Sequence, residues 1–349
     1  MTEIAVDNPA LRAELESVID EQRDAFYASG WWHSIDLGAG RVTPGVHQPA
    51  ELQRNYREFE LPENLAGKRL LDLGCWDGFY SFEAERHGAQ VTSVDVWRPQ
   101  TYFQAHAALQ SQAVFHEKSV YELKRDELGG FDIVLFLGVL YHLKHPLLAL
   151  ERVCEMTNDF AVIETHAVDN LFDTSRPVME FYEVDQLGGQ YDNWWGPNSE
   201  CVMQMARAAG FVRTEALRID PTRAVVKAYR RWLPWENLEA VPSLRIRRVI
   251  NACTDDERFP RHGRHAYLAL MVEGLPEGAR RELLQFDIGG FGSTAVYLGP
   301  SKFAEDAGAL QLTVPIPLGL SMDQAWVRMR YENQCAAEWK LDLCEGREW

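Results

Sequence analysis

The sequence lacks the features that mark several classes of protein. No run of 18 apolar residues occurs, so we expect no membrane-spanning helix. The N-terminal stretch carries acids where a signal peptide needs a basic start and an apolar core, which predicts a cytoplasmic protein. The six cysteines form no C-x-x-C pair and no H-E-x-x-H motif is present, so we expect free thiols and no metal site.

Positive charge is also scarce. The chain has 35 Lys and Arg residues against 52 Asp and Glu residues, a net charge of −17. A chain this acidic is a poor non-specific ligand for nucleic acid or for an anionic membrane surface. We therefore expect a small molecule as the partner, rather than nucleic acid or a membrane.

The chain has the composition of a folded protein with a sizeable core. Hydrophobic residues make up 46% and charged residues 25% of 349 residues. At roughly 150 residues per domain, this length predicts about two domains.

Strand and helix patterns alternate between about residues 68 and 230. Strands are expected at Arg69–Leu73, Gln90–Val94, Ala113–His116, Phe131–Leu137 and Asp159–Glu164. Helices are expected at Phe79–His87, Pro99–Leu109 and Pro146–Met156. An antiparallel hairpin, 211–219 with 223–229, follows a longer insertion and a helix near 199–209. This order predicts an α/β fold with a doubly wound, Rossmann-like sheet.

The flanking segments differ in pattern from this central part. Residues 1–60 are expected to form a helix (8–29) followed by an aromatic segment, and 61–235 the α/β domain. Residues 236–262 are expected to be a linker with one short helix that carries the basic run Arg245–Arg248. Period-two alternation in 263–349 predicts an antiparallel β-sandwich. Such domains more often mediate contacts or homodimers than catalysis.

The strongest motif is the glycine loop that follows the first strand. Gly74, Cys75, Trp76, Asp77 and Gly78 form a G-x-x-x-G turn with Asp72 just before it, and Asp95 ends the next strand. Glycines admit close approach of a ligand, and an acid at the end of the second strand can accept ribose hydroxyls. The acids near the loop would repel the pyrophosphate of NAD. They suit the ammonium and sulfonium groups of S-adenosylmethionine.

This motif resembles the first two motifs of class I S-adenosylmethionine-dependent methyltransferases. The resemblance implies that the loop flanks the methionine part of the cofactor and that Asp95 binds the ribose, with Val96 beside the adenine. It also implies that Leu137 and Gly138 lie beside the sulfonium. The third motif corresponds to the stretch around Val120, which lacks the usual acid, so a backbone contact to the adenine is expected there.

A narrower resemblance involves residues 131–147 and 192–211. F-D-I-V-L-F-L-G-V-L-Y-H-L-K-H-P-L is similar to a segment of the branch that contains the bacterial tRNA uridine-34 carboxymethyltransferase. A carboxymethyl donor would need a cation opposite its carboxylate, and no basic residue in the matched motifs is clearly placed for that role.

Several polar side chains are expected at the carboxyl ends of the strands, where ligands bind in such sheets. Tyr141 and His142 follow the fourth strand, and Glu164 and His166 end the fifth. A hydroxyl acceptor needs a base, so His142 and His166 are the candidates for that role, with Tyr141 near the cofactor. His142, His145, His166 and Glu164 could also form a metal site, but their spacing matches no metal motif.

Two aromatic segments are expected to converge on the same edge of the sheet. We interpret them as a lid and substrate-binding surface, formed by Trp31, Trp32, His33, Tyr182, Trp194 and Trp195. The alternative is a satellite core.

Three hypotheses for the function follow. The first is transfer of a methyl group from S-adenosylmethionine to a small molecule, at oxygen. The second is methyl or carboxymethyl transfer to tRNA. The third is a non-catalytic methyltransferase-like scaffold, against which the intact glycine loop and Asp95 speak.

Overall fold

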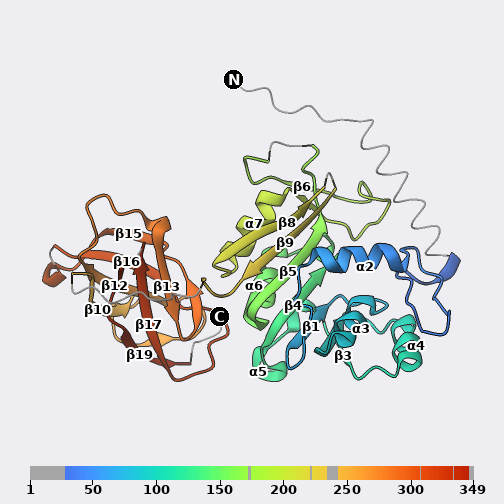
Figure 1. The fold of residues 1–349 in the computed structure, drawn as a ribbon. Coiled ribbons are helices and arrows are strands. Elements are labelled where there is room, and N and C mark those ends of the chain that lie inside the picture. Colours follow the sequence, from blue (N-terminus) through green and yellow to red (C-terminus); the bar gives the residue numbers. More distant parts are fainter. Residues whose placement is uncertain are drawn as a thin grey trace. The chain divides into compact units, whose positions relative to one another are not determined.

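The computed structural model describes residues 28–171, 174–220, 222–233, 243–306, 308–332 and 334–345. The helix expected over residues 8–29 lies almost wholly outside this part of the chain. The chain divides into two compact units, 1–209 with 214–228 and 210–213 with 229–349 (Figure 1). Among the described residues, no helix has the length and apolar character needed to cross a membrane.

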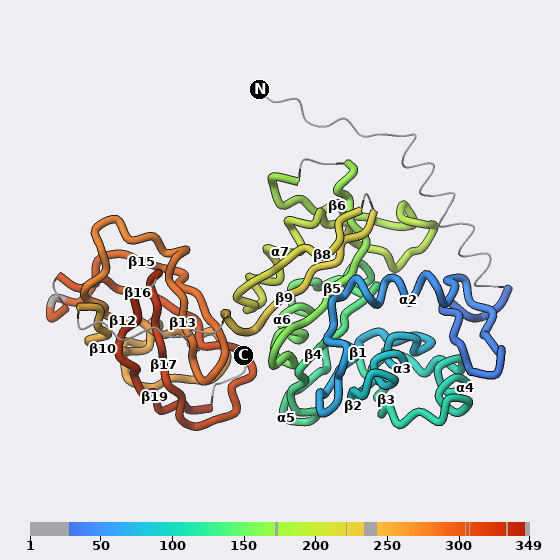
Figure 2. Tube along the Cα trace, in the orientation of Figure 1, coloured from blue at the N-terminus to red at the C-terminus, as the bar shows by residue number. Residues whose placement is uncertain are grey.

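The first unit is built on a seven-stranded sheet with the strand order β3-β2-β1-β4-β5-β9-β8. Its strands are β1 (Arg69–Leu73), β2 (Gln90–Asp95), β3 (Val114–Glu117), β4 (Phe131–Leu137), β5 (Thr157–His166), β8 (Arg213–Ile219) and β9 (Arg223–Tyr229). Strands β1 to β5 pair in parallel, and β8 and β9 lie side by side at one edge (Figure 2). The predicted Rossmann-like α/β fold is therefore confirmed.

Helices follow the strands because buried parallel strands need cover on both faces. They are α2 (Pro49–Glu58), α3 (Phe79–Arg86), α4 (Gln100–Leu109), α5 (Arg125–Leu128), α6 (Pro146–Met156) and α7 (Ser199–Ala208), with the single turns η1 (Val120–Glu122) and η2 (Leu140–His142). Helix α6 begins with Pro146, which suits a first turn, and buries Leu150 and Val153 against the sheet. Helix α2 was not expected; it also begins at a proline and buries Leu52 and Tyr56.

The insertion between β5 and α7 contains a short antiparallel ribbon. Strand β6 (Met179–Phe181) pairs with β7 (Trp195–Pro197), so that Glu180 lies opposite Gly196. The ribbon is tied to the end of β4, because the Trp194 N–H donates to the Tyr141 carbonyl at 2.8 Å. The insertion is therefore held next to the carboxyl edge of the sheet.

The second unit consists of sheets that are antiparallel, as the alternating pattern predicts, except for the short parallel pair of β11 and β19. Four strands have the order β10-β12-β16-β15, and five others the order β11-β19-β17-β13-β14, with β18 paired to β17. The strands are β10 (Arg245–Asn251), β11 (Phe259–Pro260), β12 (Tyr267–Glu273), β13 (Leu284–Ile288), β14 (Phe291–Ser293), β15 (Tyr297–Pro300), β16 (Leu310–Pro315), β17 (Gln324–Tyr331), β18 (Gln334–Cys335) and β19 (Trp339–Cys344). Their inward side chains form one apolar core that includes Phe286 and Leu312.

The expected linker helix is wrong in its second half. Arg245–Asn251 is strand β10, and it pairs with β12 in the four-stranded sheet. Its arginines form ion pairs with acids of the same unit: Arg247 with Glu273 and Arg248 with Asp306. The basic run is therefore an outward strand face and not a helix face.

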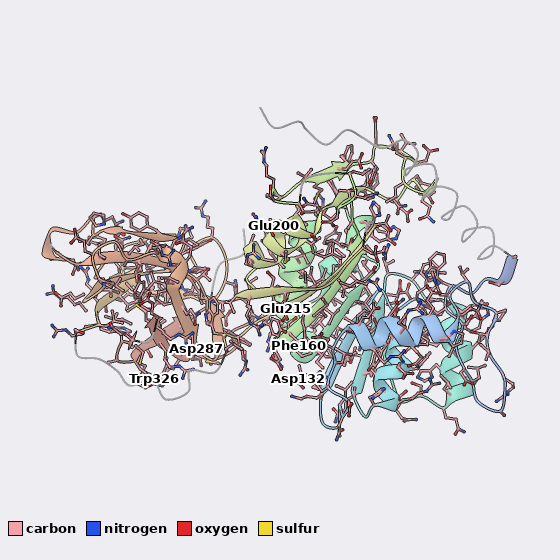
Figure 3. The ribbon with its side chains drawn as sticks, turned by 45° about the horizontal axis from the view of Figure 1, so that its top comes forward. Asp132, Phe160, Glu200, Glu215, Asp287 and Trp326 are labelled. Atoms are coloured by element: carbon pink, nitrogen blue, oxygen red, sulfur yellow. The ribbon has the colours of Figure 1, made fainter. Side chains whose placement is uncertain are left out.

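The outward face of β17 is polar around one exposed aromatic side chain. Trp326 is 52% exposed, and Asp287 on the neighbouring strand β13 pairs with Arg328 at 3.1 Å (Figure 3). Alternation of such residues with buried Val327 and Met329 is what fixes the register of the strand.

Candidate functional site

Two glycines shape the turn between β1 and α3. Gly74 has a φ of +75° and Gly78, the N-cap of α3, a φ of +90°, in the region that favours glycine. Space is a second constraint. A Cβ on Gly74 would lie 2.3 Å from Val139 Cγ2, and one on Gly78 would lie 2.6 Å from the Phe82 ring. Conformation and packing therefore both require glycine at these positions.

Trp76 lies in the same loop and has a left-handed φ of +46° without being glycine. This conformation costs about 1–2 kcal/mol for an L-residue. The Trp76 N–H donates to Asp95 Oδ2 at 3.0 Å, and its indole lies 5.1 Å from that of Trp97. Burial raises the pKa of Asp95, and backbone N–H groups, that of Trp76 first, oppose the shift. The end of β2 is thus bound to the glycine loop.

Asp72 lies beneath the loop in a buried polar chain. Ser81 Oγ donates to Asp72 Oδ2 at 2.6 Å and lies 2.8 Å from Ser93 Oγ, which accepts from the Tyr102 hydroxyl at 2.9 Å. Burial raises the pKa of Asp72 to about 7, against the opposing hydrogen bond from Ser81. Cys75 is buried as well, and burial raises the pKa of its thiol.

Asp77 connects the loop to the N-terminal aromatic segment. Its Oδ2 accepts the N–H groups of Trp32 and His33 at 2.7 and 2.8 Å. Burial lowers the pKa of His33 to about 3, with a smaller contribution from His47, although Asp77 Oδ2 is only 3.7 Å from the imidazole. His33 is therefore neutral, and its contact with Asp77 works through the backbone. Trp31 packs on the apolar cluster below the loop.

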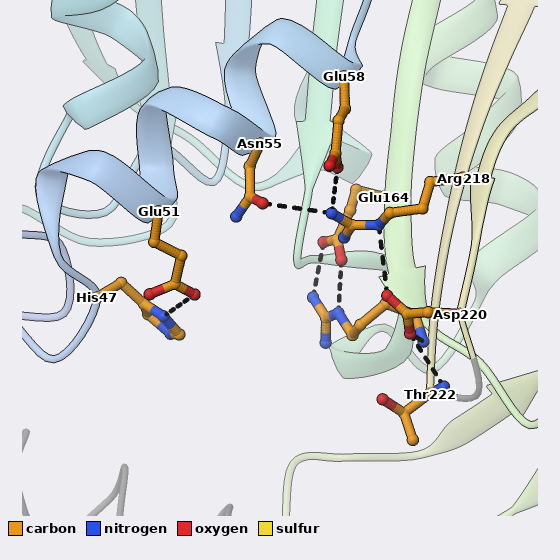
Figure 4. A network of polar contacts seen from close by, with 9 residues as sticks. His47, Glu51, Asn55, Glu58, Glu164, Arg218, Asp220 and Thr222 are labelled. Atoms are coloured by element: carbon orange, nitrogen blue, oxygen red, sulfur yellow. Dashed lines mark hydrogen bonds and ion pairs between the residues drawn. The ribbon is translucent and has the colours of Figure 1, made fainter.

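The second part of the site lies where β4 and β5 end. Gly138 has a φ of +69°. A Cβ on Gly138 would lie 3.9 to 4.0 Å from three polar atoms: Arg223 Nη2, Glu164 Oε2 and Tyr141 Oη. Arg223 Nε and Nη2 donate to the two oxygens of Glu164 at 2.5 and 2.6 Å (Figure 4). Tyr141, Glu164 and Arg223 thus surround the space in front of Gly138.

A second arginine, on β8, ties this edge to helix α2. Arg218 Nη1 donates to Asn55 and Glu58 of α2, and Arg218 Nε lies 3.4 Å from Asp220 Oδ2 (Figure 4).

The two candidate bases occupy different surroundings. His142 is partly exposed, and its Nδ1 lies 3.3 Å from the Asp192 carbonyl oxygen and 3.6 Å from its carboxylate. Burial lowers the pKa of His142, and Asp192 opposes this shift. His166 is buried, with Nε2 3.2 Å from the Tyr182 hydroxyl. Only His166 is held inside the fold.

The remaining predicted residues lie in η1, at the end of β4 and in the insertion between β5 and α7. Val120 is buried in η1, which Ser119 caps, and Leu137 is the last residue of β4. The Lys144 ammonium lies over the Trp194 ring, 4.4 Å from its centroid. Trp195 packs on Phe181, with ring centroids 5.1 Å apart. Among the described residues, no group of three or more His, Cys, Asp and Glu side chains could hold a metal ion.

The strand-end cluster comprises Tyr141, Glu164, His166 and Arg223, with Glu180 and Tyr182 of the insertion. Sequence reasoning missed two of its charged residues. Arg223 is separated from its partner Glu164 by 59 residues, and no motif includes it. Glu180 contacts the Tyr182 hydroxyl from within the insertion. Arg223, which lies outside the matched segments 131–147 and 192–211, borders Gly138.

Comparison with known proteins agrees with this geometry. Residues 46–212 match a family described as a methyltransferase domain. The chain is 29% identical over 202 residues to the tRNA U34 carboxymethyltransferase of Pseudomonas fluorescens, with 56% of this chain and 62% of the relative covered. The enzyme of the same name from Stutzerimonas stutzeri is 28% identical over 205 residues, with 56% and 61% covered. The chain thus spans about three fifths of the length of these curated relatives.

Solved structures with a similar fold are more distant in sequence. The N-terminal domain of EvdMO1 with SAH bound is 19% identical, with a TM-score of 0.43, and covers 60% of this chain and 95% of its own. The magnesium protoporphyrin IX methyltransferase of Synechocystis with bound SAM is 15% identical, with a TM-score of 0.37, and covers 51% and 77%. Over residues 46–212, this chain is thus similar to a methyltransferase domain.

Proposed function

We propose that this protein is a methyltransferase that transfers the methyl group of S-adenosylmethionine to the oxygen of a small-molecule acceptor. The observation that carries the proposal is the charge of the glycine loop. Asp77 lies in the loop and Asp95 against it, and residues 72–78 contain no lysine or arginine. A cationic ligand fits this set of carboxylates, and a pyrophosphate does not.

The residues proposed to bind S-adenosylmethionine have distinct roles. Asp95 binds the ribose hydroxyls, Val96 lies beside the adenine, and Val120 provides a backbone contact. The loop from Gly74 to Gly78 flanks the methionine part, and Leu137 and Gly138 lie beside the sulfonium. S-adenosylmethionine supplies a methyl group that is activated by its attachment to a cationic sulfur.

The acceptor is proposed to meet the donor at the strand-end cluster. Tyr141 and His166 are the polar side chains that can orient a hydroxyl there, because their rings lie 6.3 Å apart at the ends of neighbouring strands. Aligning two reactants in this way supplies several kcal/mol of the barrier. The aromatic segment at Trp31, Trp32 and His33 and the one at Trp194 and Trp195 are proposed to cover the acceptor.

The first experiment is calorimetric titration with S-adenosylmethionine. We expect Asp95→Ala to weaken binding about 10- to 100-fold, because it removes a charge-assisted contact worth about 1.5–3 kcal/mol. The exposed Asp126→Ala is the matched control and should bind as the unaltered protein does. The absence of binding by the unaltered protein would overturn the proposal.

The acceptor is then identified with isotopically labelled S-adenosylmethionine. The protein is incubated with cell extract, and labelled products are found by mass spectrometry. A small molecule that gains one labelled methyl group supports the proposal. Label recovered only in RNA contradicts it.

A second candidate function is carboxymethyl or methyl transfer to tRNA. Two observations favour it: the names of the curated relatives and the position of Arg223, whose guanidinium borders Gly138. Glu164 already neutralises that guanidinium through two hydrogen bonds, and the net charge of −17 disfavours a polyanionic partner. One measurement distinguishes the two candidate functions. Binding of tRNA that weakens steeply as salt rises would establish this second candidate and exclude the first.

A further inference from the structure

The insertion between β5 and α7 contains a compact loop, residues 182–194, that is closed on itself. Its two ends are joined, because the Tyr182 N–H donates to the Trp194 carbonyl at 2.9 Å. Inside the loop, Asn193 Nδ2 donates to the Leu187 carbonyl at 2.7 Å, and both side chains are buried. Residues 182–194 therefore form an Ω-loop, a compact surface loop of the kind that often has a function.

Hydrogen bonds within the Ω-loop keep its shape. The Gly189 N–H donates to the Asp185 carbonyl at 3.0 Å, and the Gln190 N–H donates to the Leu187 carbonyl at 3.4 Å. Tyr191 lies on the outer side of the loop and is 81% exposed, so this side is not covered. Because these bonds are internal, the loop can move away from the sheet without losing them.

Three contacts hold one end of the Ω-loop against η2 and the residues that follow it. The Trp194 N–H donates to the Tyr141 carbonyl at 2.8 Å. The Lys144 ammonium lies 4.4 Å from the centroid of the Trp194 ring. His142 Nδ1 lies 3.3 Å from the Asp192 carbonyl oxygen and 3.6 Å from the Asp192 carboxylate. These three contacts form a latch between the Ω-loop and the end of β4.

The latch lies next to the position proposed for the donor's sulfonium. Tyr141 Oη would lie 4.0 Å from a Cβ on Gly138, and the Tyr141 ring packs on His142 with ring centroids 4.1 Å apart. Tyr141 therefore borders the space in front of Gly138 with its side chain and holds the Ω-loop with its carbonyl. Closure of the loop is for this reason coupled to whatever occupies that space.

Two buried polar atoms on either side of Trp194 have no hydrogen-bond partner among the described residues. They are Asn193 Oδ1 and Trp195 Nε1. A buried polar atom without a partner destabilises the state that buries it. The closed arrangement seen in the structure thus leaves two hydrogen bonds unmade that water would complete in an open one.

We propose that the Ω-loop is a lid, which opens from η2 as one body to admit the acceptor and closes through the latch during methyl transfer. This inference rests on the proposed function, because that function places the two reactants in front of Gly138. In this role Lys144 and His142 act on the loop and not on the reacting atoms. Closure keeps water away from the reactants, and opening releases the product.

Hydrogen exchange of the full-length protein, resolved by residue, tests the lid without a ligand. The Trp194 amide reports on the latch, and the Gly189 and Gln190 amides report on the interior of the Ω-loop. We expect Lys144→Met to accelerate exchange at Trp194 about 2- to 30-fold, the range that corresponds to loss of a cation–π contact. Gly189 and Gln190 should exchange as before. Lys124→Met, the same change at an exposed lysine outside the latch, should alter none of the three amides.

A second variant tests the other side chain of the latch. His142→Phe removes the contact with Asp192 and keeps an aromatic ring on Tyr141. It should accelerate exchange of the Trp194 amide as well, with the interior amides of the Ω-loop unchanged. Near-ultraviolet circular dichroism verifies that each variant is folded.

The link between the lid and the site is tested with S-adenosylmethionine. At saturation we expect exchange of the Trp194 amide to slow about 5- to 150-fold, the usual range for coupling between two sites. The reason is that the bound donor fills the space beside Tyr141 and favours the closed loop. Asp95→Ala, at a concentration where calorimetry finds it unoccupied, should show no slowing.

The lid and the proposed function fail in different ways. Equal acceleration of Trp194, Gly189 and Gln190 in Lys144→Met would mean that the loop unfolds and does not open as one body. An unchanged Trp194 rate in both latch variants, or an unchanged rate in protein that has bound S-adenosylmethionine, also overturns the lid. Absence of calorimetric binding overturns the proposed function instead, and the measurement without ligand then still decides whether the loop opens.

Discussion

At the scale of single residues, burial decides how the acids of the glycine loop behave. Asp72 is 2% exposed and has Ser81 as its polar partner, so its charged form is poorly solvated. Asp95 and Asp77 are also buried, but each accepts backbone N–H groups. Of these three carboxyls, Asp72 is the one whose pKa is raised as far as about 7.

Asp72 makes the stability of the unliganded protein depend on pH. Its folded pKa, about 7, exceeds its ordinary value of 3.8, so the folded state holds a proton that the unfolded state has already released between these values. The free energy of unfolding should therefore fall as pH rises from about 4 to about 7, by up to roughly 4 kcal/mol, and level off above. Denaturant unfolding across this range measures the effect.

The matched pair of variants for this measurement is Asp72→Asn and the exposed Asp126→Asn. The first should remove most of the slope, because an amide cannot titrate, and the second should retain it. A slope that persists in Asp72→Asn would assign the pH dependence to another group.

Single residues also show how far sequence alone reaches. Gly74, Gly78 and Asp95 could be placed from the motif, because a turn and the two strands beside it are local features. Arg223 could not be placed, since its partner Glu164 is 59 residues away and an arginine that begins a strand has no signature.

At the scale of elements, the N-terminal aromatic segment depends on one carboxylate. Asp77 accepts the N–H groups of both Trp32 and His33, and the contact joins residues more than 40 positions apart. The segment otherwise packs through apolar side chains, including Trp31 and Ile35, in a cluster with residues of α2, α3 and α4.

We expect Asp77→Ala to loosen the segment around Trp32 and His33 while the sheet stays folded. Two charge-assisted hydrogen bonds are lost, each worth about 1.5–3 kcal/mol at most. Hydrogen exchange should accelerate locally by at least tenfold in residues 31–35, and β4 should keep its protection. Equal acceleration in both elements would mean that Asp77 supports the whole unit and not this segment. Asp126→Ala again serves as the control.

Some strands were missed by the sequence patterns for physical reasons. Strands β6 and β7 are three residues each, too short for a periodicity to be visible. In β10 the alternation of Arg245, Ile246 and Arg247 is broken by a shift of register between Ile246 and Arg248, so the pattern no longer repeats every two residues. The buried strands β1 and β4 have no such interruption and were predicted at their observed bounds.

At the scale of the whole molecule, each of the two units has its own apolar core. The cluster of the second unit lies entirely within residues 244–343, and the core around the glycine loop includes Phe79 and Tyr102. Units with separate cores are expected to unfold separately.

Calorimetry of the full chain should therefore show two unfolding transitions. Saturation with S-adenosylhomocysteine should raise only one of them, because a ligand at 100 times its dissociation constant stabilises the unit that binds it by about 2.7 kcal/mol. A single transition that moves as a whole would show instead that the two units unfold together.

The tryptophan pair beside Asp95 has a consequence for measurement. The indoles of Trp76 and Trp97 lie 5.1 Å apart and are inclined at 69°, so their electronic transitions couple and contribute an exciton signal to the circular dichroism. That signal originates beside the Asp95 carboxylate, which accepts a hydrogen bond from the Trp76 N–H. A nucleoside that settles there would alter the spectrum directly, which makes its arrival observable by stopped-flow spectroscopy without an attached fluorophore.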